Sequence, residues 1–342
     1  MSNTPDDKSV QEAYCKRVSE RDPAEYAYHK DLSVEGEALE SRPLRTSNCL
    51  RILRIPPRRI ALCGGGVRGI AHVGVMKALK LANLLKYVKE VIGISAGSLF
   101  ALLWVLDYTV EQIEKLCVDF DFNVLQNIDI LNFPLTYGFD DGQGLEKLIT
   151  SILRQKGFSE NATFEDIVLK HPTHLRCFAT ELQTSRIRQF GTVSTPKISV
   201  KFAIRASMSF PIMYTPVEEP ETGALLMDGG LMSNLPLIFL NDKEVYETWG
   251  VFFTGKTHKI YPVTGLIDVL RCIFDSSNVM KSLPFMEKLK NHLILIPTDK
   301  SSSFDFEQTK EDRSKLITFA YMKTWDFLYS SVERPARRYS AH

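Results

Sequence analysis

Two short apolar segments in this chain each lead into a turn of small residues and then into a helical pattern. The first, Ile60 to Cys63, precedes the glycine-rich run Gly64 to Gly69 and a helix that we expect to reach about Leu85. The second, Val91 to Ile94, precedes Ser95 and an apolar helix. Because a strand, a helix and a further strand in succession favour parallel pairing, the sequence predicts an α/β fold with a parallel sheet.

The rest of the chain continues this alternation. Further strands are predicted at 175–180, 186–190, 224–227, 251–254 and 293–296, and helices at 96–106, 145–155, 200–207, 266–274 and 314–329. The segment before about Pro57 is charged, rich in turn residues and without sustained periodicity. We therefore expect a polar N-terminal arm at residues 1–58, one α/β domain at 59–300, and a C-terminal helix and tail packed on that domain at 301–342.

Charge and cysteine content argue against several classes of function. The 42 Lys and Arg residues nearly balance the 41 Asp and Glu residues, so no global field recruits nucleic acid. Six cysteines are scattered without a CxxC pair, which is typical of reduced thiols and gives no support for a metal site. The first twenty residues are polar and lack the apolar core of a signal peptide, so we expect a cytoplasmic protein, free or peripheral at membranes.

The segment Gly93-Ile94-Ser95-Ala96-Gly97 matches the GxSxG pattern and lies between a predicted strand and a predicted helix. In that context the pattern forms a nucleophile elbow, a tight turn that exposes the serine hydroxyl at the edge of the sheet. Small residues two positions before and after the serine allow the strand and the helix to pass closely. The pattern is short and also occurs by chance, so its position in the chain is what identifies Ser95 as a candidate nucleophile.

The glycine-rich run Gly64-Gly65-Gly66-Val67-Arg68-Gly69 also follows a strand and precedes a helix. Backbone N–H groups in such a loop converge on an anion, so the run is a candidate oxyanion hole. It also fits the GxGxxG pattern of dinucleotide-binding folds, with Glu90 about 20 residues further on. That alternative is weaker, because the ribose-binding acid of those folds follows the second strand, whereas Glu90 precedes it.

A third motif, Asp228-Gly229-Gly230, follows the apolar segment 224–227. Its carboxylate is expected at a strand end, on a backbone whose two glycines leave space for close approach to Ser95. Asp and Gly also dominate ordinary turns, and Asp141-Gly142 is a second example in this chain. The motif is therefore weak by itself and gains weight from the other two.

The order GGGxRG, GxSxG and DGG resembles the patatin-like phospholipases. The resemblance covers roughly 59–329 and extends to Ala206, Ser207, Pro211, Pro216, Asn234, Pro236 and Leu295-Ile296-Pro297. It implies a three-layer α/β/α fold with a mostly parallel central sheet. It also implies a hydrolase that cleaves lipid esters with a Ser-Asp dyad, here Ser95 and Asp228, and without a cofactor or metal.

By this resemblance, ionised Asp228 takes the proton of Ser95 directly as the oxygen attacks an acyl carbonyl, and water then hydrolyses the acyl-enzyme. The N–H groups of Gly65 and Gly66 are the first candidates to bind the oxyanion. Two roles are open for Arg68: it holds the loop through hydrogen bonds to neighbouring backbone, or its guanidinium meets a substrate phosphate. The expected partner is a lipid substrate, met in transient contact with a membrane surface.

One apolar segment outside the motifs bears on the substrate. Residues from Phe120 to Phe139 are rich in Phe, Leu and Ile. Such a segment is a candidate lining for an acyl-chain pocket near the nucleophile, although clusters of this kind are more often ordinary core.

Two functional alternatives remain open. In a Ser-His-Asp triad the histidine would follow the acid, which leaves His258, His292 and His342 as candidates, none of them beside a recognisable catalytic motif. The second alternative is a catalytically silent lipid-binding or scaffolding protein with the same fold. No residue of the three motifs is missing, which argues against it.

Overall fold

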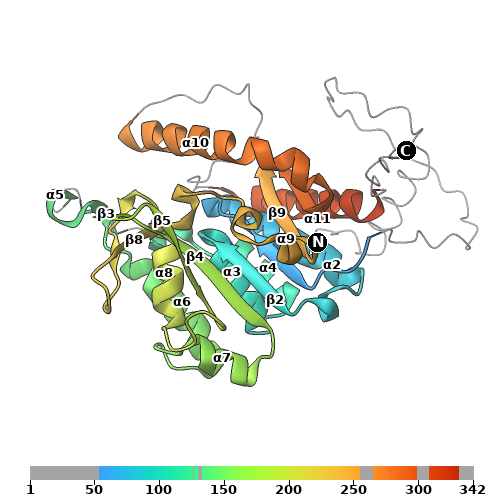
Figure 1. Cartoon of the computed structure of the whole chain (residues 1–342), viewed down its shortest axis with the longest axis horizontal. Coiled ribbons are helices and arrows are strands. Elements are labelled where there is room, and N and C mark those ends of the chain that lie inside the picture. The colour runs from blue at the N-terminus through green and yellow to red at the C-terminus, as the bar shows by residue number, and fades with distance from the viewer. Residues whose placement is uncertain (1–53, 126, 130–132, 255–264, 299–307, 331–342) are drawn as a thin grey trace, which may run out of the picture. The chain divides into compact units, whose positions relative to one another are not determined.

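The computed structural model describes residues 54–125, 127–129, 133–254, 265–298 and 308–330. All of these residues belong to one unit of the chain, 54–342. The arm predicted at 1–58 therefore lies almost entirely outside the described residues, as do His258 and His342. Figure 1 shows a central sheet with helices packed around it.

The main sheet has eight strands, in the order β10-β9-β1-β2-β4-β8-β7, with β5 also paired to β4. Five strands run parallel to one another: β1 (Arg59–Leu62), β2 (Glu90–Ile94), β4 (His174–Glu181), β9 (Thr248–Thr254) and β10 (Leu293–Pro297). Three pair in antiparallel fashion: β5 (Arg186–Gly191), β7 (Val217–Glu218) and β8 (Leu225–Asp228). The predicted mostly parallel central sheet is confirmed. A separate two-stranded parallel sheet joins β3 (Gly138–Asp140) and β6 (Ile212–Tyr214).

Strands β2 and β8 lie end to end along one edge of β4. Ile94 pairs with Phe178 in parallel register, and Asp228 pairs with the next residue, Ala179, in antiparallel register. Strand β5 pairs with residues 176–181 and so occupies the opposite edge of β4. The carboxyl ends of β2 and β8 therefore converge on the same point of the sheet.

Helices cover the sheet and form the outer layers of a three-layer α/β/α fold (Figure 1). The helices are α2 (Ala71–Leu81), α3 (Ala96–Val105), α4 (Val110–Asp119), α5 (Phe133–Thr136), α6 (Gln143–Gln155), α7 (Phe164–Lys170), α8 (Val200–Ser207), α9 (Asp242–Tyr246), α10 (Leu266–Leu289) and α11 (Lys310–Tyr329). Helix α3, which is apolar on almost every side, packs on β1, β2 and β4, while α8 packs on β4 and β8. Helices α2, α4 and α11 pack against one another.

Two predicted helices have the wrong extent. The first, α2, ends at Leu81 and not near Leu85, and a 3₁₀ helix at Gly66–Ile70 precedes it. The other, α10, continues past Phe274 to Leu289, although Pro284 lies inside it. Its continuation is explained by tertiary packing, since Asn278 and Ser282 on one face of α10 are buried.

Helices α4 and α7 were not predicted, although their start signals are local. Each begins at a capping box, formed by Thr109 with Gln112 and by Thr163 with Asp166. No helix in the described part of the chain has the length and apolar character needed to cross a membrane.

Candidate active site

Ser95 occupies a tight turn between β2 and α3 and has a backbone conformation that is rare for a residue with a side chain. Its φ is 53° and its ψ is −131°. A Cβ on Gly93 would collide with the Ser98 backbone, and a Cβ on Gly97 would collide with the Leu62 carbonyl. The two glycines of GxSxG are thus explained by close packing of strand and helix around the elbow.

Both backbone groups of Ser95 are held by hydrogen bonds. Its N–H donates to Ser207 Oγ at 3.0 Å, and Ser207 Oγ in turn donates to the Phe178 carbonyl at 2.7 Å. The Ser95 carbonyl accepts from Ser98, from the N–H at 2.8 Å and from Oγ at 2.6 Å. The strained conformation of Ser95 is therefore imposed by three elements: α3, α8 and β4.

Asp228 is the last residue of β8 and is 1% exposed. Its N–H donates to the Ser209 carbonyl at 2.9 Å, and its carbonyl accepts from Thr180 Oγ1 at 3.0 Å. The side-chain Oδ1 accepts from the Gly230 N–H at 2.7 Å. A Cβ on Gly229 would collide with the backbone of β4, so this position requires glycine. These contacts hold Asp228 at the carboxyl end of β2, next to the turn that contains Ser95.

The Asp228 carboxyl group has an elevated proton affinity. Burial raises its pKa to about 7, against the opposing effects of hydrogen bonding to the Ser95 side chain and to the Gly230 N–H. Asp228 Oδ2 has no partner of regular hydrogen-bond geometry among the described residues. The interaction with Ser95 is therefore loose, as catalytic contacts often are without substrate. A buried and sparsely paired carboxylate of this kind is suited to accept a proton from a neighbouring hydroxyl.

The glycine loop lies beside Ser95: a Cβ on Gly64 would be 3.0 Å from the Ser95 Cβ. The Gly65 carbonyl accepts from Arg68, from the N–H at 3.2 Å and from Nε at 3.4 Å. Because a peptide unit is planar and trans, a Gly65 carbonyl turned toward Arg68 directs the Gly66 N–H the opposite way. Of the two roles considered for Arg68, this contact corresponds to holding the loop.

Ser95 and Asp228 both border a cavity of about 130 Å³ with largely apolar walls. Gly65, Gly66, Val67 and Arg68 form one side of it. The apolar lining is contributed by several elements and includes Leu99, Phe100, Phe120, Phe122, Leu125, Leu145, Leu148, Met208, Phe210 and Phe274. Part of the segment 120–139 thus lines the cavity, whereas its Phe133 and Phe139 stack on each other.

Comparison with known proteins agrees with this arrangement. A model of the family described as patatin-like phospholipase matches residues 60–241. The chain belongs to the patatin-like phospholipase family. An uncharacterized protein of Acanthamoeba polyphaga mimivirus is 29% identical to this patatin-like chain over 203 residues, 58% of this chain and 66% of the viral protein. The neuropathy target esterase sws of Drosophila melanogaster is 30% identical over 183 residues, 52% of this chain but 11% of the esterase.

Solved structures share the patatin-like fold at low sequence identity. VipD from Legionella pneumophila superposes with a TM-score of 0.56 at 17% identity, over 80% of this chain and 67% of VipD. ExoU of Pseudomonas aeruginosa, in complex with SpcU, superposes with a TM-score of 0.50 at 17% identity, over 80% of this chain and 52% of that one. These similarities confirm the predicted fold.

None of the histidines in the described ranges of this patatin-like protein lines the cavity. His292 directly precedes β10, and β10 runs parallel to β9, β1 and β2. His292 therefore lies at the amino-terminal ends of these strands, whereas Ser95 follows the carboxyl end of β2. His72 is fully buried, where burial lowers its pKa to about 4, and its Nε2 donates to the Cys63 carbonyl at 3.0 Å. In the same ranges, no group of three His, Cys, Asp or Glu side chains is arranged to hold a metal ion.

Asn234 lies against both the glycine loop and the DGG turn of this patatin-like protein, a contact that was not predicted from the sequence. A Cβ on either Gly64 or Gly230 would collide with the Asn234 side-chain oxygen. Its N–H donates to Asn278 Oδ1 of α10 at 2.8 Å, and the residue borders the cavity. In the sequence, Asn234 was noted only for its position after the DGG motif, and that position did not predict a contact with the glycine loop.

Proposed function

We propose that this protein is a lipid acyl hydrolase, of phospholipase A type or a related lipase, that cleaves carboxylic ester bonds through a Ser95–Asp228 dyad and an acyl-enzyme. The observation that carries the proposal is the pairing of Ile94 and Asp228 with consecutive residues of β4. This register sets a strained, partly exposed serine next to a buried carboxyl group of raised pKa.

In the first half of the reaction, ionised Asp228 accepts the proton of Ser95 Oγ as this oxygen bonds to the acyl carbon. The carbonyl electrons move to the oxygen, where N–H groups of the glycine loop, first those of Gly65 and Gly66, stabilise the negative charge. Each such donor is worth roughly a hundredfold in rate. The ester C–O bond then breaks, and Asp228 returns the proton to the departing alcohol.

In the second half, Asp228 takes a proton from water while the water oxygen attacks the acyl carbon on Ser95. The bond to Ser95 Oγ breaks, the proton returns to Ser95, and a fatty acid leaves. No step requires a metal ion, a redox partner or an organic cofactor. The buried position of Asp228 supports this scheme, because a base with a pKa near the working pH serves both half-reactions.

The lining of the cavity supports an acyl chain as the group next to the nucleophile. Its aromatic and aliphatic side chains can cover a hydrocarbon chain, and its polar lining includes Ser95, Asp228, Asn234, Asp275 and the glycine loop. The word esterase in the name of the fly relatives agrees with ester chemistry. No observation favours the catalytically silent lipid-binding protein, since every motif residue is present.

The test is acyl release from phospholipid vesicles and from a triacylglycerol emulsion, with a soluble short-chain ester in parallel. We expect Ser95→Ala and Asp228→Asn to abolish release while both variants remain folded, and a fluorophosphonate to label wild type but not Ser95→Ala. Full activity in Ser95→Ala would overturn the proposal. Absence of both activity and labelling in wild type would favour the silent lipid-binding protein.

A further inference from the structure

Helix α10 carries a stripe of apolar side chains that face away from the domain. Val269, Ile273, Met280 and Leu283 are 41%, 62%, 68% and 53% exposed. Their spacing of four, seven and three residues places them on one face of a helix. Ser276 lies on the same face, so the described stripe contains no charge. A contiguous exposed apolar surface of this kind marks an interaction site.

The opposite face of α10 is fixed against the catalytic loops. Phe274 lines the cavity and lies against Gly230, where an added Cβ would come within 3.0 Å of its ring. Asn278 Oδ1 accepts the Asn234 N–H at 2.8 Å, and the described face also includes Lys281, whose Nζ donates to a backbone carbonyl at 2.7 Å. The apolar stripe is therefore held directly outside the cavity that contains Ser95.

A second segment bordering the cavity has the same two-sided arrangement. In the 3₁₀ helix Phe122–Leu125, the first and last residues line the cavity, while Val124 between them is 60% exposed. We call these exposed residues of both segments the apolar rim: Val124, Val269, Ile273, Met280 and Leu283. The rim thus belongs to two segments that are far apart in the chain and that both contribute other residues to the cavity lining.

We propose that the apolar rim docks the protein on a phospholipid bilayer, with α10 lying in the plane of the interface, so that a lipid reaches Ser95 without crossing water. This inference rests on the proposed function, because a bilayer lipid is the molecule whose acyl chain must enter the cavity. The apolar rim and the apolar lining lie on opposite sides of the same two segments.

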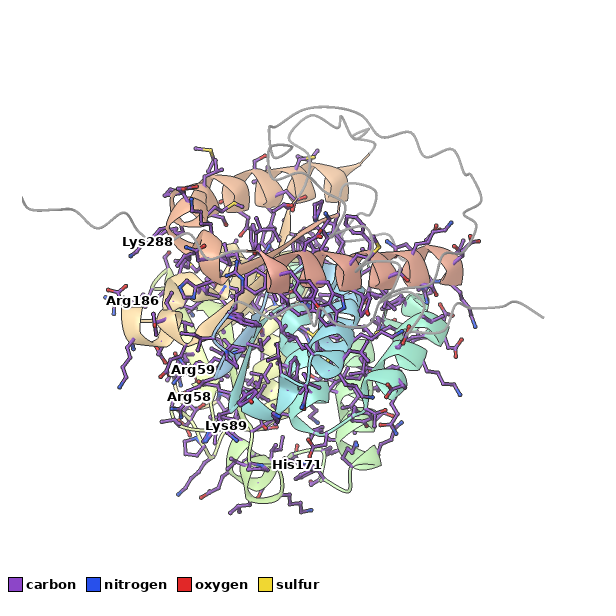
Figure 2. All side chains as sticks on the ribbon, turned by 90° about the vertical axis from the view of Figure 1, so that its right-hand side faces the viewer. Arg58, Arg59, Lys89, His171, Arg186 and Lys288 are labelled. Atoms are coloured by element: carbon purple, nitrogen blue, oxygen red, sulfur yellow. The ribbon has the colours of Figure 1, made fainter. Side chains whose placement is uncertain are left out.

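Charge at the end of the stripe fits an anionic lipid surface. Residues 281–290 contain three lysines and one acid, Glu287. Lys281 donates to the Leu231 carbonyl, whereas Lys288 and Lys290 have partly exposed side chains that pair with Asp242 at 3.7 Å and with Glu287 at 2.9 Å. Figure 2 shows Lys288 on the left-hand side of the molecule, above Arg58 and Lys89. Lysines that flank an apolar helix face can extend to phosphate headgroups while the apolar side chains enter the acyl region.

The experiment measures binding of the full chain, as Ser95→Ala to prevent turnover, to vesicles of phosphatidylcholine with and without phosphatidylserine. The docking variant is Ile273→Asp combined with Met280→Asp. The matched control is Val193→Asp, which changes an apolar residue that is 83% exposed in the loop after β5, at the far edge of the sheet. We expect the docking variant to lose about tenfold or more in vesicle binding and the control to lose none.

A second readout separates failure of docking from failure of the proposed function. With Ser95 intact, the ratio of vesicle hydrolysis to soluble-ester hydrolysis should fall about tenfold or more in the docking variant and stay constant in Val193→Asp. If no ester is cleaved at all, the proposed function fails while vesicle binding still tests the rim. Unchanged vesicle binding by the docking variant would overturn the inference. A double variant Arg58→Glu/Lys89→Glu that loses vesicle binding, while the docking variant keeps it, would also overturn the inference. So would a dimer of the wild-type chain that dissociates in the docking variant.

Discussion

The Oγ atom of Ser207 accepts the backbone N–H of Ser95 at 3.0 Å. Ser207 ends α8, and Ser209 two residues later accepts the N–H of Asp228 through its carbonyl at 2.9 Å. One short segment after a helix thus positions the backbones of both Ser95 and Asp228. Ser207 contacts neither of these side chains, so for the proposed dyad it is a positioning residue.

Replacement of Ser207 by alanine should release the elbow. The Ser95 N–H would lose its buried acceptor, which costs about 1–3 kcal/mol in the free energy of unfolding. Displacement of the nucleophile should also lower kcat for a soluble ester, roughly 10- to 100-fold, with a smaller change in KM. Ser98→Ala is the control, because the Ser95 carbonyl would still accept the Ser98 N–H. An unchanged kcat in Ser207→Ala would contradict the positioning role.

Hydrolysis of a soluble ester should depend on pH through Asp228. Burial raises the pKa of this group to about 7, and only its ionised form can accept the Ser95 proton. We expect kcat/KM to reach a plateau above about pH 7 and to fall about tenfold per pH unit below it. The measurement is a pH–rate profile of the wild-type protein with its folding checked at each pH. A profile that stays flat from about pH 5 to about pH 8 would mean that Asp228 is not the base.

The same pKa predicts a gain in stability on removing the charge. The folded-state pKa of Asp228 is raised from its ordinary 3.8, so the stability it contributes is present at low pH and is lost as pH rises through about 7. Asp228→Asn should therefore be more stable than wild type above pH 7, by on the order of a few kcal/mol, and no more stable at about pH 4. Thermal unfolding at several pH values tests this. Equal unfolding temperatures of Asp228→Asn and wild type at every pH would contradict this prediction.

His292→Ala should retain activity. Its Nδ1 interacts with the Thr248 carbonyl at 3.2 Å, at the amino-terminal ends of β9 and β10. Ser95 lies at the other end of these parallel strands, after the last residue of β2. We expect kcat/KM within about twofold of wild type, with at most a modest loss of stability from the missing hydrogen bond. A loss comparable to that of Asp228→Asn would instead indicate a triad.

Much of the fold could be predicted from local patterns. The apolar runs that became β1 and β2, the small residues after them and the apolar α3 carry their signals within a few residues. The errors concern elements whose extent depends on packing. Helix α10 continues beyond Phe274 because Asn278 and Ser282 are buried against the rest of the domain, and no local signal at 275–289 indicates that burial.

The sequence by itself determined the chemical groups of the site: Ser95 between two glycines after a strand, Asp228 before two glycines, and the glycine loop. Those signals are local because each reflects a tight turn where only small residues fit. Only the tertiary structure decided how these groups meet, through the pairing of Ile94 and Asp228 with consecutive residues of β4. It also decided the acceptor at Ser207 and the apolar cavity, since both are assembled from segments whose contacts depend on the packing of the whole domain.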